Sequence, residues 1–253
     1  MMILQRLLLA FLLLFPLMLT PAADAAVVLV DQGHGQRFRV DGEGELDLSK
    51  LATILNEQGC ELRLATTPLD AEALTGVDAV ITSGAFLPYK PDELKDLFAF
   101  VEAGGKLAVM LHIAPTYSPL MGKLGVFHSN GVIHEQDAVI KENDLNFKVT
   151  HLEASPLTDG LQSFSLYGGW ALLSGAENSR IVARSGERSW VDLNGDKKLG
   201  EGDAMQSLGV IIYGTQGAGE FAIFGDDAIF QNRFLDATNQ KLARNLGSWL
   251  ARP

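Results

Sequence analysis

The first half of the chain alternates apolar runs with amphipathic segments. The runs at 26–31, 60–65, 78–83 and 106–112 read AVVLVD, CELRLA, DAVITS and KLAVMLH. Apolar runs of this length are typical of strands buried on both faces of a parallel sheet. Because helical patterns separate several of them over short connections, the sequence predicts an α/β fold with an open, mainly parallel sheet and helices on both faces.

Two helices are predicted between these strands. Segment 47–59 places leucines at helical spacing, with Asp47 as a plausible N-cap and Gly59 as a stop. Segment 91–105 carries a second apolar face, begins at Pro91 and ends in two glycines. Both segments are long enough for the crossover connections of a parallel sheet.

The second half has a more mixed pattern. Residues 118–163 offer candidate strands only at 138–142 and 147–152, with a turn at 155–160. Further along, 179–185 is expected to be a strand, 208–226 a β-hairpin that turns at 217–219, and 239–250 a final helix. No repeat or long linker divides the chain, so residues 26–253 are expected to form a single domain.

The amino-terminal segment resembles a secretory signal peptide. Arg6 precedes an apolar core from Leu7 to Leu19, and the segment ends in Ala23-Asp24-Ala25. The apolar core is shorter than the roughly 20 residues that a membrane-spanning helix needs. We therefore expect residues 1–25 to be removed and the protein to be periplasmic or secreted, with no membrane span after removal.

Composition narrows the classes of partner. The chain has a formal net charge of −11, which disfavours nucleic acid and anionic lipid as partners. Cys60 is its single cysteine, so no internal disulfide can form, and no lipid-attachment cysteine follows the expected cleavage site.

The stretch DLNGDKKLGEGD, residues 192–203, has the oxygen-ligand spacing of a calcium loop. The predicted ligands are side-chain or backbone oxygens of Asp192, Asn194, Asp196, Lys198 and Asp203. Lys197 stands where glycine normally makes the sharp turn, and the flanks are strand-like rather than helical. The alternative is a solvated turn whose carboxylates face water. The sequence favours a structural Ca²⁺.

Polar residues also follow the predicted strands, where open parallel sheets bind ligands. Candidates for a metal site, or for a base with an orienting partner, are Asp31, His34 and His112. Gln32, Ser83, Asp226 and Asp227 would line the same ligand cleft. The alternative is that these residues cap helices or fix loops by hydrogen bonds.

The usual nucleophiles are missing from the sequence. There is no GxSxG motif, and no cysteine between glycines follows a strand. Cys60 opens a predicted buried strand and is expected to be a small core residue.

Segment 78–111, DAVITSGAFLPYKPDELKDLFAFVEAGGKLAVML, resembles the class I glutamine-amidotransferase-like superfamily. VVLVDQGHGQRF, KLGVFHSNGVIHE and FAIFGDDAIFQNRFLDATNQKLARNLGSWL resemble more narrowly its GIFT-type branch. That branch comprises domains of intraflagellar transport proteins, auxiliary proteins of gliding-motility ABC transporters and exported bacterial proteins of unknown function.

The resemblance implies a flavodoxin-like or amidotransferase-like sheet, with a C-terminal β-hairpin and helix. It places His112 where amidotransferases carry their cysteine, which excludes an acyl-cysteine mechanism. We therefore expect an exported, non-catalytic binding or assembly module with an envelope protein or carbohydrate as partner. The alternative is a hydrolase or metal-dependent enzyme that uses Asp31, His34 and His112.

Overall fold

The computed structural model describes residues 25–252, so the predicted signal peptide lies almost wholly outside the described residues. The helices are α1 (Ser49–Glu57), α2 (Pro91–Glu102), α3 (Ala114–Lys123), the 3₁₀ helix η1 (Ala228–Phe230) and α4 (Ala237–Leu250). The strands are β1 (Ala26–Asp31), β2 (Cys60–Ala65), β3 (Ala79–Ser83), β4 (Lys106–Met110), β5 (Val126–His134), β6 (Val139–Ile140), β7 (Asn143–Val149), β8 (His151–Leu152), β9 (Phe164–Tyr167), β10 (Trp170–Ser174), β11 (Ser179–Arg184), β12 (Trp190–Val191), β13 (Ala204–Met205), β14 (Gly209–Gln216) and β15 (Gly219–Phe224).

The main sheet joins a parallel half to an antiparallel half. Strands β2, β1, β3, β4 and β15 lie side by side and run parallel. The hairpin β14–β15 then reverses the direction, and β10, β5, β12 and β13 continue the sheet antiparallel. The prediction of a mainly parallel sheet is therefore not confirmed. It describes only the half that is built from strand–helix–strand units.

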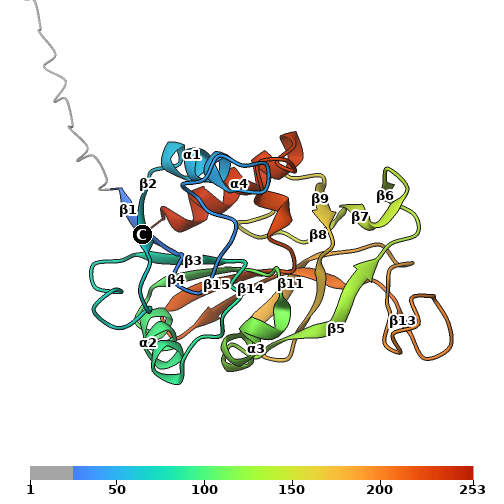
Figure 1. Ribbon diagram of the computed structural model, residues 1–253, viewed down its shortest axis with the longest axis horizontal. Helices are drawn as coiled ribbons and strands as arrows, with labels where there is room; N and C mark the ends of the chain where they lie inside the picture. Colours follow the sequence, from blue (N-terminus) through green and yellow to red (C-terminus); the bar gives the residue numbers. More distant parts are fainter. Residues whose placement is uncertain (1–24, 253) are drawn as a thin grey trace, which may run out of the picture.

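Two layers of helices cover the parallel half (Figure 1). Helices α1 and α4 pack against each other on one face, over a core that contains Leu51, Phe224 and Trp249. Helices α2 and α3 cover the other face, over a core that contains Leu97, Tyr117 and Phe221. A separate three-stranded sheet, β6–β7–β9, adds Phe147 and Phe164 to the core beneath α4. The predicted C-terminal hairpin and helix are present.

The mixed region from 118 to 163 holds more structure than its pattern indicates. Helix α3 went unpredicted because Pro115 lies in its first turn and Pro119 lies inside it, and proline normally argues against a helix interior. Strand β5 in this region, and strands β9 and β10 directly after it, were also missed. The expected strand at 147–152 divides into the end of β7 and the short β8.

The helix starts differ from the predicted ones. Leu48, and not Asp47, occupies the N-cap of α1, and no side chain caps that helix. The Asp47 carboxylate instead accepts the backbone N–H groups of Arg39 and Gly44, at 2.8 Å each, and so organises the loop before the helix. Helix α4 begins at Ala237, because Asp236 accepts the N–H groups of Thr238 and Asn239.

In residues 25–252, no helix combines the length and the apolar character needed to cross a membrane.

Candidate functional site at the carboxyl edge of the parallel strands

The predicted cleft residues do gather where the parallel strands end. Asp31 is the last residue of β1 and Ser83 the last of β3, and these strands are direct neighbours in the sheet. His112 follows β4, and Asp227 follows β15, whose register pairs Phe224 with Met110. Because parallel strands share one carboxyl edge, four segments distant in sequence meet there.

Asp31 and His34 form a closed polar network with Glu93 of α2. His34 Nδ1 lies 2.9 Å from both Asp31 oxygens, and its Nε2 lies 3.0 Å from Glu93 Oε1. The His34 side chain is 6 % exposed. Both ring nitrogens are therefore engaged, and the ring has no free edge for a substrate or a metal.

Further hydroxyl and amide groups enclose the Asp31 carboxylate. Oδ2 accepts hydrogen bonds from Tyr89 at 2.5 Å, Gln36 at 2.8 Å and Thr82 at 3.2 Å. The Tyr89 ring stacks on His34, with centroids 3.9 Å apart. This satisfied network fixes the turn after β1 against α2.

The charges in this network favour a protonated His34. Burial lowers the pKa of His34, but the hydrogen bonds and negative charges of Asp31 and Glu93 outweigh burial and raise it overall. Burial also raises the pKa of Tyr89 well above its ordinary value, so its hydroxyl stays a donor.

His112 forms a second and more open pair. Its Nδ1 lies 3.1 Å from Asp227 Oδ1, and its side chain is 38 % exposed. This hydrogen bond raises the pKa of His112, and the negative charge of Asp227 adds to the effect. Nε2 makes no hydrogen bond within residues 25–252.

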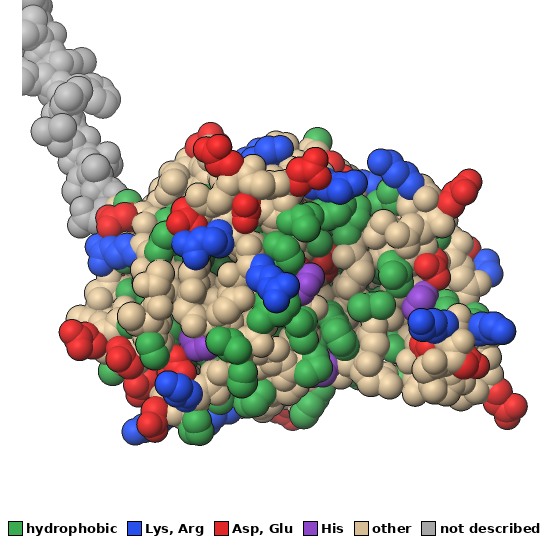
Figure 2. Space-filling model, viewed as in Figure 1, with side chains coloured by type: hydrophobic (Ala, Val, Ile, Leu, Met, Phe, Trp, Pro, Cys, Tyr) green, Lys and Arg blue, Asp and Glu red, His purple; other side chains and the backbone are tan. Residues whose placement is uncertain are grey.

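Aromatic side chains border this pair. The rings of Phe38 and Phe86 lie 4.9 and 5.4 Å from the imidazole of His112, measured between centroids. The guanidinium of Arg37 lies 4.7 Å from the centre of the Phe86 ring. Figure 2 shows hydrophobic side chains gathered across the middle of one face, with histidine and basic side chains among them.

Asp226 has a structural role beside the site. Its oxygens accept the backbone N–H groups of Tyr167 at 2.7 Å and Ala228 at 2.8 Å, which join β9 to the turn after β15. Burial, together with the charge of Asp227, raises the pKa of Asp226 to about 8. Burial raises the pKa of Asp227 as well, while its hydrogen bond to His112 opposes the change.

Several buried polar atoms at this edge lack a protein partner. The Gln32 amide nitrogen and oxygen, Ser83 Oγ and Asp227 Oδ2 make no hydrogen bond within residues 25–252. The backbone of Gly84 closes over Asp227, since a Cβ at Gly84 would lie 2.7 Å from Oδ2. Gly84 also has a φ of 60°, in the left-handed region that residues with a side chain rarely adopt, so this backbone conformation favours glycine as well.

The predicted cluster therefore separates into two groups. Asp31 and His34 pair with Glu93, whereas His112 pairs with Asp227. In the part of the chain that the structure describes, no three His, Cys, Asp or Glu side chains are arranged to hold a metal ion.

Sequence reasoning missed Glu93, Tyr89 and Thr82. Glu93 lies in the first turn of α2, where an acidic residue is ordinary and carries no signal of its own. Its role depends on the loop after β1 lying against that turn, which only the tertiary structure shows.

The loop 192–203 turns its acidic side chains onto its own backbone. Asp192 accepts the N–H groups of Gly195 at 2.6 Å and Lys197 at 2.8 Å, and Asp203 accepts those of Leu193 and Gly200 at 3.0 and 2.8 Å. Lys197 has a φ of 62°. The sharp turn expected at the sixth position is present, with lysine in a conformation that favours glycine.

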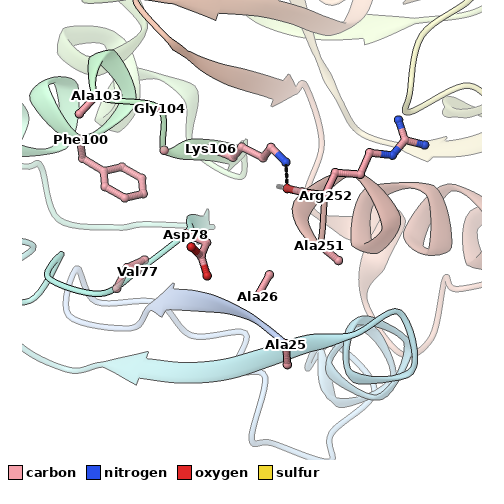
Figure 3. Close-up of a pocket in the computed structure, with 11 residues that line it drawn as sticks. Ala25, Ala26, Val77, Asp78, Phe100, Ala103, Gly104, Lys106, Ala251 and Arg252 are labelled. Carbon is pink, nitrogen blue, oxygen red and sulfur yellow. Dashed lines mark hydrogen bonds between the residues drawn. The ribbon is translucent and has the colours of Figure 1, made fainter. Parts of the chain in front are cut away.

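A pocket of about 570 Å³ lies at the opposite edge of the sheet, by the amino ends of β1 and β4 (Figure 3). The Lys106 ammonium donates there to the carbonyls of Trp249, at 2.9 Å, and Arg252. Asp78 lies beside Ala26 in the same pocket (Figure 3). These contacts tie the end of α4 to the sheet.

Comparison with known proteins gives a likeness of fold. No protein-family model matches the chain, and no curated protein matches it significantly. Among solved structures, the mmIFT52 N-terminal domain matches with a TM-score of 0.72 and 17 % identity, over 89 % of this chain and 98 % of that one. A ThuA-like protein from Bacteroides uniformis matches with a TM-score of 0.55 and 15 % identity, over 91 % of this chain and 94 % of that one. A cytoplasmic protein from Salmonella typhimurium LT2 matches with a TM-score of 0.55 and 15 % identity, over 90 % of this chain and 100 % of that one. The chain thus has an amidotransferase-like fold.

Proposed function

We propose that this protein is an exported binding or assembly module of the GIFT-type branch, on an amidotransferase-like scaffold without the cysteine nucleophile. Its partner would be an envelope protein or carbohydrate, recognised at the open face around His112. The higher TM-score of the mmIFT52 domain, compared with the ThuA-like protein, supports this branch.

The position of the single cysteine carries the proposal. Cys60 begins β2, is buried, and donates to the carbonyl of Gly247 on α4. Burial raises the pKa of the Cys60 thiol to about 11, so the thiolate is scarce at neutral pH. The turn after β4 presents His112 instead, and an imidazole paired with Asp227 cannot form the thioester of an amidotransferase.

The surface around His112 suits recognition. Phe38 and Phe86 offer apolar area, Arg37 adds a positive charge to an acidic protein, and Leu87 beside them is 57 % exposed. Aromatic and arginine side chains supply much of the energy at protein interfaces.

One observation favours the enzyme alternative. Asp227 orients His112 through Nδ1 and leaves Nε2 open, which is how a carboxylate positions a histidine general base. A hydrolase would need this pair to activate a water directly, because the Asp31–His34 network is closed.

Site-specific photocross-linking tests the binding proposal. A benzophenone amino acid at Leu87 should form discrete adducts with envelope components, and Phe86→Ala in the same protein should remove them. The matched control carries the probe at Phe127, which is 55 % exposed on the antiparallel half. Equal adducts from both positions, or none from position 87, would contradict the proposal.

We also propose that the loop 192–203 binds a structural Ca²⁺. Asp192, Asn194, Asp196 and Asp203 would supply side-chain oxygens and Lys198 its carbonyl. The left-handed turn at Lys197 and the closing position of Asp203 support this proposal. Asp192→Ala combined with Asp196→Ala should abolish any rise of melting temperature in millimolar calcium. An identical rise in the double variant would contradict it.

A further inference from the structure

The antiparallel half of the sheet holds an apolar pocket of about 360 Å³, and its lining includes none of the residues named around His112. Strands β10 and β11 both pair with β14, but β10 does so only at Leu172 and Gly209. Residues of β10, β11 and β12 and the segment 206–209 line the pocket. Its volume is at the lower end of the range for small-molecule sites.

Apolar side chains form most of the pocket wall. The wall includes Leu172 of β10, Ile181 of β11 and Leu208, which directly precedes β14. Val191 of β12 and Leu193 in the loop that follows complete the apolar lining. This lining would accept an alkyl chain or an aromatic ring and shield it from water.

Arg184 brings a charge to this apolar lining. Register shifts in β11 between Ile181, Ala183 and Arg184 bring Arg184 opposite Gly209. Gly209 has no side chain, and a Cβ there would lie 2.5 Å from the Leu172 carbonyl oxygen. The Leu172 backbone therefore approaches Gly209 too closely for a side chain there, and Arg184, which pairs with Gly209, lines the pocket.

The guanidinium of Arg184 forms no ion pair or side-chain hydrogen bond with any residue in 25–252. Its neighbour on the strand differs: Arg180 lies 3.6 Å from Glu153 and donates to the carbonyl of Ala154 at 2.6 Å. A half-buried arginine at an apolar pocket suits a carboxylate, which it can bind in a bidentate manner.

We propose that this pocket binds a small aliphatic carboxylate, with its carboxylate on Arg184 and its chain between Leu172, Leu208 and Val191. The proposal concerns a site separate from the His112 face and stands independently of the function proposed there.

Calorimetric titration with octanoate, below the concentration at which it forms micelles, tests the site. The intact protein should bind one equivalent, and Arg184→Gln should weaken binding about tenfold or more through loss of a charge-assisted contact. The matched control is Arg180→Gln, which makes the same change in charge on the same strand and should bind as the wild type does. Octanol, which has the chain without the charge, should bind more weakly than octanoate.

A second variant tests the cavity itself. Ala204→Leu adds volume at the wall from β13 and should weaken octanoate binding while the melting temperature stays close to that of the wild type. Amide chemical-shift changes on titration should concentrate at Leu193 and Gly209. No saturable binding to the wild type, equal binding by Arg184→Gln, or shifts centred on His112 would each overturn the proposal.

Discussion

At the scale of single residues, His34 shows how the fold uses buried charge. Its imidazole lies between Asp31 and Glu93, with Tyr89 stacked on its face and Gln36 bonded to the same carboxylate. Removing one member of such a network leaves the other charged groups buried without partners, which is costly in a folded protein. The network therefore stabilises the turn after β1.

This arrangement predicts a pH-dependent effect of His34→Gln. The folded-state pKa of His34 is raised above its ordinary value of 6.5. Its ion-pair stabilisation is therefore fully present below about pH 6.5 and is lost as the pH rises through the folded-state pKa. Urea unfolding at several pH values should show the variant losing most stability at low pH, with a smaller loss in the alkaline range.

The difference in unfolding free energy between the wild type and His34→Gln reports on His34 alone. Asp226, whose raised pKa also makes stability fall as the pH rises from about 4 to about 8, is common to both. A difference in unfolding free energy that stays constant, or grows with pH, would show that His34 is neutral in the folded protein.

At the scale of elements, α4 depends on one buried amide. Asn239 is fully buried, and its side chain accepts from the N–H of Ser165 and donates to the carbonyls of Ser165, Ile229 and Phe234. Asn239→Ala would leave these backbone groups without partners, at a cost of about 2–4 kcal/mol in unfolding free energy. Gln240→Ala on the same helix removes one hydrogen bond, to the carbonyl of Leu235 before the helix, and should cost below about 1 kcal/mol. Equal melting temperatures for the two variants would refute this role.

Two neighbouring lysines in the loop 192–203 allow a matched pair of glycine substitutions. Lys197 has a φ of 62°, which costs a side-chain-bearing residue about 1 kcal/mol, whereas Lys198 is outside this left-handed region. Lys197→Gly and Lys198→Gly change the charge equally, but only the first relieves strain. Calorimetry should therefore show tighter calcium binding by Lys197→Gly than by Lys198→Gly. The reverse order, or no binding heat from either variant, would count against a calcium loop.

At the scale of the whole molecule, the expected cleavage site after Ala25 lies directly before the first strand of the fold. Strand β1 begins at Ala26, whose N–H donates to the Gly59 carbonyl at 3.1 Å, and the next N–H donates to Asp78 at 2.7 Å. Cleavage after Ala25 would keep all of β1 and place the new ammonium group close to the Asp78 carboxylate. Amino-terminal sequencing of exported protein should begin near Ala26, and exported protein that retains Met1 would contradict the signal-peptide prediction.

The sequence predicted the parallel half of the molecule well and the antiparallel half poorly. Strands β1, β3 and β4 are easy to predict because burial on both faces demands nearly unbroken apolar runs, whereas β2 lies at the edge of the sheet and has exposed positions. Strand β5 alternates buried, half-buried and exposed positions, and α3 contains two prolines, so neither has a clear period.

The sequence predicted which edge of the sheet would hold the candidate residues, but not which residues would pair with each other. Asp31, His34, His112 and Asp227 all lie at the predicted carboxyl edge of the parallel strands. Which histidine meets which carboxylate depends on Glu93 and the turn after β15, and these contacts join residues up to 115 positions apart. No spacing in the sequence encodes them.

Turnover on a panel of amides, esters and glycosides, by the wild type and by His112→Ala, tests the central claim most directly. A module without a nucleophile should give the same background rate for both proteins, because His112 contributes a surface and not a reacting group. Melting temperatures measured in parallel establish that both are folded. Substantial turnover by the wild type, lost in a His112→Ala protein of unchanged stability, would show that the His112–Asp227 pair is catalytic and contradict the binding-module account.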